Sequence, residues 1–322
     1  MNVGVWIPCY RRWTDRAAVL RLAREAEAMG FGSLWVQDHI VAPLGDADEQ
    51  PVDLLHSWLE PDDYGNQRFS AVEYYGEENW WLDPYVLWGF LAAATETCEL
   101  ASNVIVLPYR NPVVQAKMLG TLDVLSGGRM VLGVGVGHVP GEFDVLDVPY
   151  KERGHLTDEY LQVMAALLEN EEVSFEGKTI RFPMVRNLVQ PVQRPRPPFL
   201  VGGTGKKSIR RAVDLGDGWL PAHVLPHQLG PAFDYLAEYA GQQGKPVPPV
   251  SVVSVVGITE PGQSPPSGSR RRFRTVAETA ALIAGYAELG VVRLAVDVPN
   301  PNLDVTLRQY ELLAEAMRMV AS

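Results

Sequence analysis

Asp38-His39 joins an acid and an imidazole directly behind a short apolar run, Ser33–Gln37. Histidine changes its charge near neutral pH, and a neighbouring carboxylate can fix its tautomer or raise its pKa. Adjacent strand residues point to opposite faces, so only one of the two side chains can face a site at the end of the strand. We expect His39 to be the catalytic group and Asp38 to assist it. The alternative for Asp38 is a hydrogen bond between strand and helix.

A glycine-rich stretch runs from an apolar strand-like segment into a helical one. Backbone N–H groups before a helix N-terminus, aided by the helix dipole and a lysine, form an anion site that suits a single phosphate ester. The spacing excludes a Walker A loop. The alternative is a tight turn with a solvent-facing lysine. The expected cofactor contacts are Gly202, Gly203, Thr204, Gly205 and Lys206.

A second glycine run, Leu132–Gly137, resembles a dinucleotide fingerprint. His138 and then Pro140-Gly141 follow it, and no helix is expected there, which argues against a Rossmann site. We expect Gly135 and Gly137 to let the strand approach a planar ring closely. His138 would lie at the same place and also contact the cofactor.

Further histidines and tryptophans are candidates for lining the site. His223 and His227 have helical spacing, but Pro226 separates them and no further ligand completes a metal site, so none is expected. The expected substrate contacts are Trp6, Trp58, Trp81 and His223.

Short β-rich runs alternate with helical segments along the whole chain. The expected strands are Val3–Pro8, Ser33–Gln37, Leu100–Leu107, Met130–Gly135, Phe199–Val201, Gly218–Pro221, Val250–Ile258 and Val291–Val296. The helices expected between them are Asp15–Met29, Pro84–Thr97, Pro112–Leu125, Leu156–Leu168, Ser208–Leu215, Pro231–Gln242, Val276–Leu289 and Asn302–Val320.

Eight strand-plus-helix units predict an α/β fold, a closed (β/α)8 TIM barrel formed by residues 1–322 as a single domain. Three segments exceed a minimal barrel, after strands 2, 4 and 7. Residues 40–81 are acidic and aromatic, and we interpret them as a lid, with an oligomer interface as the alternative. Residues 173–198 predict a hairpin and a proline-rich link. Residues 260–274 predict a flexible surface loop.

Composition narrows the class of protein. The formal charge of −11 excludes an extended phosphate-binding face, so no nucleic-acid partner is expected. Two cysteines cannot form a disulfide framework and favour a reducing compartment. The most apolar stretch, Tyr85–Ala94, is too short to span a bilayer, and no signal peptide is recognised. A cytoplasmic protein without membrane contact is expected.

The order of several motifs resembles the bacterial luciferase-like family, and most closely its branch of coenzyme F420-dependent oxidoreductases. The similarity covers roughly residues 1–222. The motifs that carry it are Asp38-His39, Asn103–Pro112, Thr121–Arg129 with Ser126-Gly127-Gly128-Arg129, Leu132–Gly137, Glu152-Arg153-Gly154, Pro191-Val192-Gln193, Val201-Gly202-Gly203 and Gly216–Trp219.

The resemblance implies a flavin or deazaflavin ring at the barrel mouth and the cofactor phosphate near Gly202–Lys206. It also implies a non-proline cis peptide at Asn103–Val104, which would support one face of the ring, and a homodimer. The luciferases place a phosphate-binding arginine where Val136 stands here. This difference favours F420 over FMN.

Three functions follow. The first is an F420-dependent oxidoreductase that transfers a hydride to or from an organic substrate, bulky and apolar or aromatic, while His39 manages the proton. The second is an FMNH2-dependent monooxygenase whose apolar lid keeps water out. The third is a non-catalytic barrel that binds a flavin-like ligand.

Overall fold

The computed structural model describes residues 1–43, 52–53, 68–69, 80–260, 262–264 and 272–321. Trp58, most of the expected lid and the central part of the 260–274 loop therefore lie outside the described residues.

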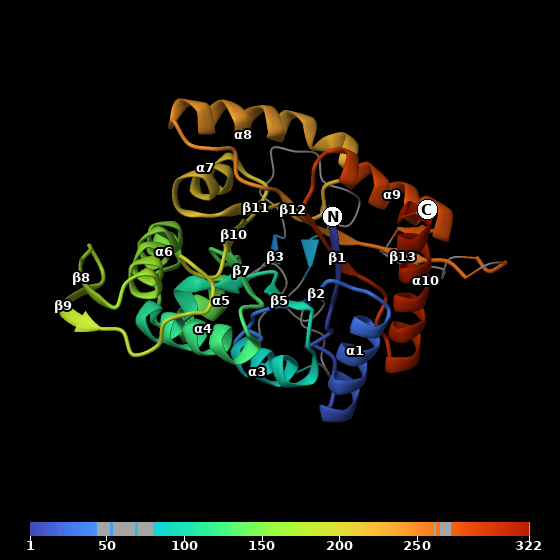
Figure 1. The fold of residues 1–322 in the computed structure, drawn as a ribbon, viewed down its shortest axis with the longest axis horizontal. Helices are drawn as coiled ribbons and strands as arrows, with labels where there is room; N and C mark the ends of the chain where they lie inside the picture. Colours follow the sequence, from blue (N-terminus) through green and yellow to red (C-terminus); the bar gives the residue numbers. More distant parts are fainter. Residues whose placement is uncertain (44–51, 54–67, 70–79, 261, 265–271, 322) are drawn as a thin grey trace.

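Parallel strands form a nearly closed barrel (Figure 1). Within the described residues, eight strands follow one another in the hydrogen-bonded order β11-β10-β7-β5-β2-β1-β15-β12. Isolated bridges Trp219–Val250 and Ala222–Val253 join the two ends of this path. The predicted barrel is confirmed. The strands are β1 (Asn2–Trp6), β2 (Ser33–Val36), β5 (Glu99–Ser102), β7 (Met130–Gly135), β10 (Phe199–Gly202), β11 (Gly218–Leu220), β12 (Ser251–Val255) and β15 (Arg293–Asp297).

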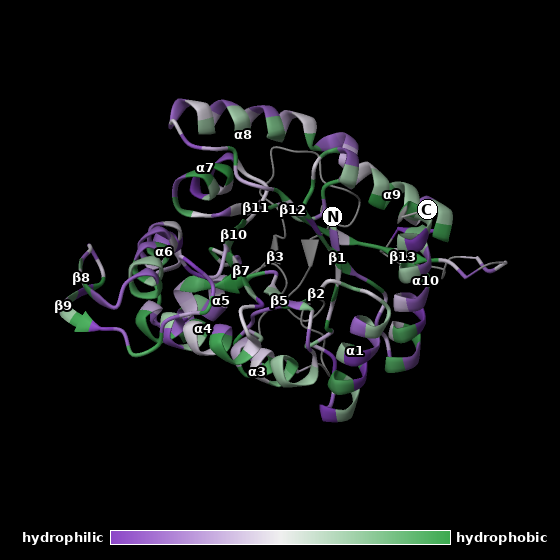
Figure 2. Ribbon diagram, viewed as in Figure 1, coloured by the Kyte–Doolittle hydropathy of each residue, from purple (hydrophilic) through white to green (hydrophobic). Residues whose placement is uncertain are grey.

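Helices follow the strands and cover the outside of the barrel. Several begin at side chains that accept hydrogen bonds from the first turn, as at Asp15, Asp83, Asn111 and Thr275. Figure 2 shows hydrophilic and hydrophobic residues alternating along outer helices such as α8. The helices are α1 (Arg16–Ala28), α3 (Pro84–Ala94), α4 (Pro112–Ser126), α6 (Arg153–Glu169), α7 (Lys206–Leu215), α8 (Gly230–Gln242), α9 (Val276–Glu288) and α10 (Leu303–Ala321).

Several shorter elements lie outside the eight barrel strands and eight outer helices. The predicted hairpin is present as β8 (Glu172–Glu176) and β9 (Arg181–Arg186). The sequence did not predict α5 (Pro140–Val145), which begins two residues after His138. The remaining elements are β3 (Val52–Asp53), β4 (Arg68–Phe69), β6 (Ile105–Val106), η1 (Leu107–Tyr109), η2 (Tyr150–Glu152), η3 (Pro226–Gln228), β13 (Gly257–Ile258) and β14 (Phe273–Arg274).

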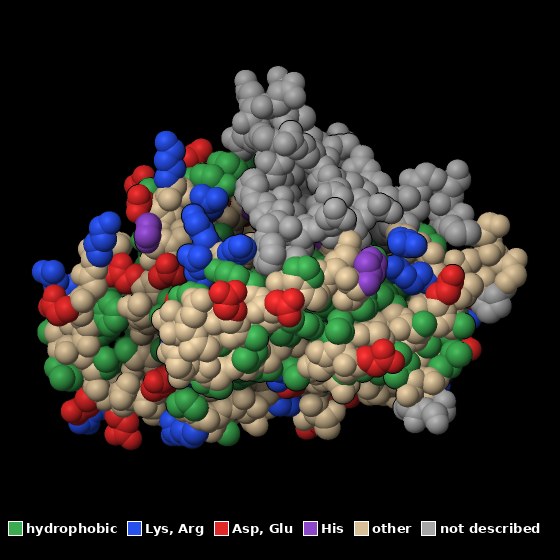
Figure 3. All heavy atoms as spheres, turned by 90° about the horizontal axis from the view of Figure 1, so that it is seen from above, with side chains coloured by type: hydrophobic (Ala, Val, Ile, Leu, Met, Phe, Trp, Pro, Cys, Tyr) green, Lys and Arg blue, Asp and Glu red, His purple; other side chains and the backbone are tan. Residues whose placement is uncertain are grey.

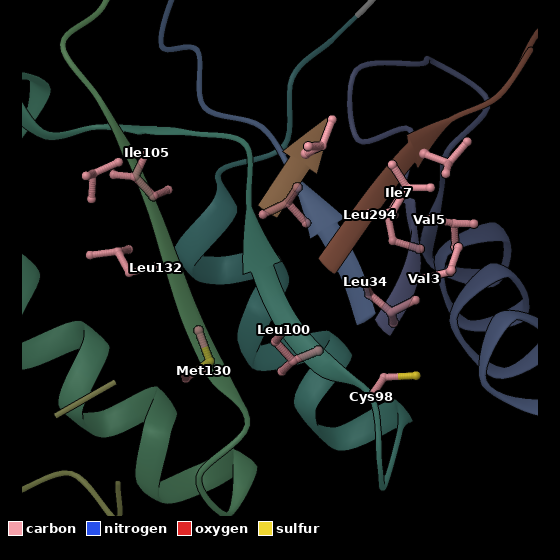
Figure 4. Packing of buried hydrophobic residues seen from close by; sticks show 14 of the residues in the cluster. Val3, Val5, Ile7, Leu34, Cys98, Leu100, Ile105, Met130, Leu132 and Leu294 are labelled. Carbon is pink, nitrogen blue, oxygen red and sulfur yellow. The ribbon is translucent and has the colours of Figure 1, made fainter. Parts of the chain in front are cut away.

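Strand side chains alternate between two apolar cores. Val3, Val5 and other residues of the strands pack outward against the helices, as Figure 4 shows. Inside the barrel lies a second cluster formed by Trp6, Trp35, Ala101, Val131, Leu200, Leu220, Val253 and Ala295. The barrel interior is therefore packed below its mouth, and a ligand must bind at the ends of the strands.

Arg129, in the Ser126–Arg129 motif, ties α3 to the sheet. Its guanidinium donates to the carbonyls of Ala92, Thr95 and Cys98 at 2.9–3.0 Å, and its Nε donates to that of Ser126 at 2.7 Å. Two of these carbonyls belong to the C-terminal end of α3, where unpaired C=O groups and the helix dipole favour a cation. The motif therefore has a structural role.

Arg129→Ala is expected to lower the free energy of unfolding by about 2–4 kcal/mol, because several partly buried carbonyls lose a charged donor. Urea denaturation measures the loss. Arg129→Lys keeps the charge but only part of the hydrogen bonding. Its free energy of unfolding should therefore lie between those of the wild type and of Arg129→Ala. If the free energy of unfolding of Arg129→Ala differs from that of the wild type by less than about 0.5 kcal/mol, water replaces the hydrogen bonds of Arg129.

Candidate active site at the carboxyl ends of the strands

His39 and Glu142 form a buried pair at the barrel mouth. Nδ1 of His39 lies 2.8 Å from Oε2 of Glu142, although the two residues are 103 positions apart in the sequence. His39 follows β2 and Glu142 lies in the first turn of α5. The carboxylate fixes the orientation of the imidazole, since Nδ1 is bound to it.

Glu142 is held by two more donors. The backbone N–H of Ile40 donates to Oε1 at 2.6 Å, and the hydroxyl of Tyr109 donates to Oε2 at 2.8 Å. Burial raises the pKa of Glu142, but the hydrogen bonds from His39, Ile40 and Tyr109 outweigh it, so the pKa lies below its ordinary value. Glu142 is therefore an ionised, immobile anchor for His39.

Asp38 faces away from His39, as strand alternation requires. Its two carboxylate oxygens accept hydrogen bonds from Arg110 at 2.7 and 2.8 Å, and Oδ2 also accepts from the N–H of Val106 at 3.0 Å. Burial raises the pKa of Asp38 above its ordinary value. The carboxylate beside His39 is thus Glu142, and Asp38 instead fixes the segment that follows β5.

Aromatic rings surround His39. Trp81 meets its ring edge-on with centroids 4.5 Å apart, and His138 does so at 5.9 Å. Tyr10 packs against the other side of Trp81 at 5.1 Å. Below them Trp6 ends β1, and its buried indole N–H has no hydrogen-bond partner among the described residues. The mouth therefore combines one acid–base group with an aromatic wall.

The Asn103–Val104 peptide is cis, which confirms the expected position of a non-proline cis bond. It separates β5 from β6, so the single strand expected over Leu100–Leu107 is interrupted. A Cβ on Gly135 would lie 2.3 Å from Val104, and one on Gly202 would lie 2.7 Å from it. These glycines thus make room for Val104.

The expectation that Gly135 and Gly137 let the strand approach a planar ring stays a prediction, and the structure shows what these glycines pack against. A Cβ on Gly137 would lie 2.7 Å from Phe143 and 2.8 Å from Val106. Its φ of +81° is also a conformation that glycine adopts most readily. The glycines serve the close packing of the segments that present Val104 and α5 to the mouth.

The prediction that no helix follows His138 is wrong, because α5 begins at Pro140. Pro140 and Gly141 suggest a turn, but proline is favourable at the first position of a helix, which is where Pro140 lies. Phe143 anchors the short α5, because its ring is fully buried between Tyr109 at 5.1 Å and Tyr150 at 5.2 Å.

The turn between β10 and α7 has the expected glycine-rich form. Gly203 has φ of +112°, Thr204 is buried, and Gly205 caps α7 without a side-chain hydrogen bond. Lys206 is exposed, and its Nζ lies 4.9 Å from the ring centroid of Tyr235 on α8. The lysine thus packs along the outer helices at the edge of the turn.

His223 lies beyond β11, where it has φ of +59° and is buried. The backbone N–H of His223 donates to the carbonyl of Val253 on β12 at 2.9 Å, so this residue helps to join β11 to β12. The structure thus brings His39, His138 and Trp81 together and places Trp6 beneath the mouth, whereas Trp58 lies outside the described residues.

Sequence reasoning missed Glu142, Tyr109 and Arg110. Tyr109-Arg110 lies in a motif that supported the resemblance, which was a usable signal. The sequence around Glu142 contains no comparable signal, because a lone glutamate after Pro140-Gly141 is common on protein surfaces.

Two kinds of feature are absent from the described part of the chain. Its His, Cys, Asp and Glu side chains include no group of three or more arranged to hold a metal ion. None of its helices is both long and apolar enough to cross a membrane.

Residues 1–259 match the model of the luciferase-like monooxygenase family, and the chain belongs to this family. A Mycobacterium tuberculosis protein of uncharacterized function is 28% identical over 317 residues, 98% of each chain. The monooxygenase RslO1 from Streptomyces bottropensis superposes with a TM-score of 0.77 at 20% identity over all of both chains. An F420-dependent secondary alcohol dehydrogenase superposes with a TM-score of 0.73 at 17% identity over 99% of each. The two structures share the fold of this chain.

Proposed function

We propose that this chain is an oxidoreductase that uses coenzyme F420 and acts on a bulky apolar or aromatic organic molecule. The observation that carries the proposal is the buried hydrogen bond between His39 and Glu142 at the barrel mouth. An oriented imidazole beside an ionised carboxylate is an acid–base unit of the kind that a hydride transfer to or from a carbonyl or hydroxyl carbon requires.

The donors at the mouth suit a ring that carries a phosphate ester. The turn before α7 combines positive-φ Gly203, buried Thr204 and the start of a ten-residue helix, a donor set that fits a phosphate. Val104 projects between Gly135 and Gly202 at the base of the mouth, where an apolar side chain can pack against a flat ring. Val136 supplies no charge to a phosphate, which favours F420 over FMN.

His39 moves the proton in this proposal. When bound, the deazaflavin supplies or accepts the hydride. Glu142 holds Nδ1, so Nε2 is the nitrogen that donates a proton to a substrate oxygen in reduction or removes one in oxidation. Glu142 stabilises the imidazolium and keeps the ring in one orientation, as carboxylates do beside catalytic histidines elsewhere.

The aromatic wall defines the substrate class. Trp81 and Tyr10 present apolar faces next to His39, while the buried N–H of Trp6 offers one donor from below. Such a surface favours a molecule with a large apolar or aromatic body and few polar groups. Asp38 acts as a positioning residue, because Arg110 and Val106 occupy its carboxylate.

Titration of the purified protein with F420 and with FMN, followed by fluorescence, tests the cofactor. We expect F420 to bind at least about tenfold more tightly, a difference of about 1.4 kcal/mol. Binding of FMN without any response to F420 would refute the proposal. Oxygen uptake with reduced FMN and an organic substrate would then identify a monooxygenase.

A glycine pair supplies the control for this titration. Gly203→Ala places a Cβ 3.1 Å from that of Ser208 at φ of +112°, and it should weaken F420 binding about tenfold by distorting the turn. Gly230 begins α8 in open space, so Gly230→Ala should leave binding unchanged.

A further inference from the structure

The first two turns of α7 are strongly basic in a chain of net charge −11. The segment Lys206–Arg211 carries four cationic side chains. Arg211 forms an ion pair with Asp158 on α6. Lys206, Lys207 and Arg210 are exposed, and in the described part of the chain neither Lys207 nor Arg210 forms an ion pair with a carboxylate. Figure 3 shows Lys and Arg side chains gathered on the side of the molecule where Figure 1 places α7.

Two tyrosines of α8 hold part of this basic surface in place. Nε of Arg210 donates to the hydroxyl of Tyr235 at 2.7 Å, and its guanidinium lies 5.6 Å from the ring centroid of Tyr239. The rings of Tyr235 and Tyr239 stack at 6.3 Å, and Lys206 lies over Tyr235. Contact with these aromatic faces orients Lys206 and Arg210 on the surface of α7.

The cations lead outward from the turn before α7. Lys206 is the first residue of the helix, and Arg210 lies four residues on, on the same face and about 6 Å further along the axis. A lone phosphate in the turn would be in reach of the helix N-terminus and of Lys206 but not of a cation one turn further. This arrangement suits an anion that continues past its phosphate.

We propose that Lys206, Lys207 and Arg210 form a docking track for an acidic tail that extends from the cofactor phosphate across α7 toward α8. The inference rests on the proposed function. Coenzyme F420 carries such a tail, a chain of glutamate residues attached through its phosphate, whereas FMN ends at the phosphate. The track binds carboxylates through charge-assisted hydrogen bonds and distinguishes the two cofactors outside the reaction centre.

The test compares the affinity of the wild-type protein for two deazaflavins, F420 with its glutamyl tail and the same phosphate ester without glutamates. We expect the tail to strengthen binding about tenfold, equivalent to 1.4 kcal/mol. Lys207→Gln/Arg210→Gln should reduce this advantage to less than about twofold, and so should high salt. Lys117→Gln/Arg24→Gln, which removes exposed cations from α4 and α1, should retain it.

Each other outcome overturns a specific claim. Equal binding of both deazaflavins to the wild-type protein would refute the track and leave the F420 proposal intact. A tail advantage that survives in Lys207→Gln/Arg210→Gln would place the tail elsewhere and also refute the track. Binding of FMN with no binding of either deazaflavin would refute the proposed function itself, and the track with it. Circular dichroism of the double variant checks that α7 remains folded.

Discussion

His39→Asn is expected to lower kcat by about 10²–10⁴-fold, the usual contribution of a positioned acid–base group. Asparagine can hydrogen-bond to Glu142 but cannot exchange a proton near neutral pH, so the variant isolates proton transfer from packing. The measurement is turnover with the best substrate from a panel of alcohols, ketones and aromatic compounds, followed by the visible absorbance of F420. The affinity for F420 should change little, because the proposed phosphate donors lie at the turn before α7.

His155→Asn provides the matched control for His39→Asn. His155 is an exposed histidine in the first turn of α6, and its replacement should leave turnover within a factor of two or so of wild type. Unchanged turnover in His39→Asn would remove His39 from the mechanism. The remaining candidate for the proton would then be another group of the mouth, such as His138.

The barrel was predictable because its signals are local. Strands buried on both faces form short apolar runs, and several helices begin at a capping residue such as Asp83 or Asn111. All eight predicted strands and all eight predicted helices overlap elements of the structure. Their bounds differ mostly by one or two residues, which is where hydrogen bonding in the assembled sheet decides the ends.

The interruption of the third predicted strand could not be predicted from local sequence patterns. Residues Leu100–Leu107 are apolar except for Ser102 and Asn103, and their pattern predicts one strand. The strand ends at Ser102 and pairing resumes at Ile105, because Val104 turns into the room left by Gly135 and Gly202. Only similarity to a family pointed to Asn103–Val104, since the glycines that accommodate Val104 are distant in the sequence.

The partner of His39 could not be predicted from the sequence. Pairing an acid with its neighbour is a rule of proximity along the chain, but alternation on a strand directs Asp38 and His39 to opposite faces. Glu142 reaches His39 because β7 lies in the same barrel and α5 returns over the mouth. That return depends on the burial of Phe143, a tertiary contact with no local signature.

Glu142→Gln is expected to lower kcat by about 10²–10³-fold while the imidazole itself remains. A neutral amide can donate to Nδ1 as well as accept from it, so it no longer fixes the tautomer, and it does not stabilise the imidazolium. Tyr109→Phe is the matched control. It removes one hydrogen bond to Glu142 and keeps the ring packed on Phe143, so turnover should fall only a few-fold.

The pH dependence of unfolding tells whether Glu142 stabilises the fold through its negative charge or only through the packing of its side chain. The pKa of Glu142 lies below its ordinary value of 4.5 in the folded protein, so the ionised group stabilises the fold above that pH. The contribution is lost as the pH falls through the lowered pKa of the folded state. The stability difference between wild type and Glu142→Gln, measured by urea denaturation, should therefore be constant near neutral pH and shrink below about pH 4.5. A difference that stays constant down to the acid transition would mean that Glu142 contributes shape rather than charge, and its role as an ionised anchor for His39 would be refuted.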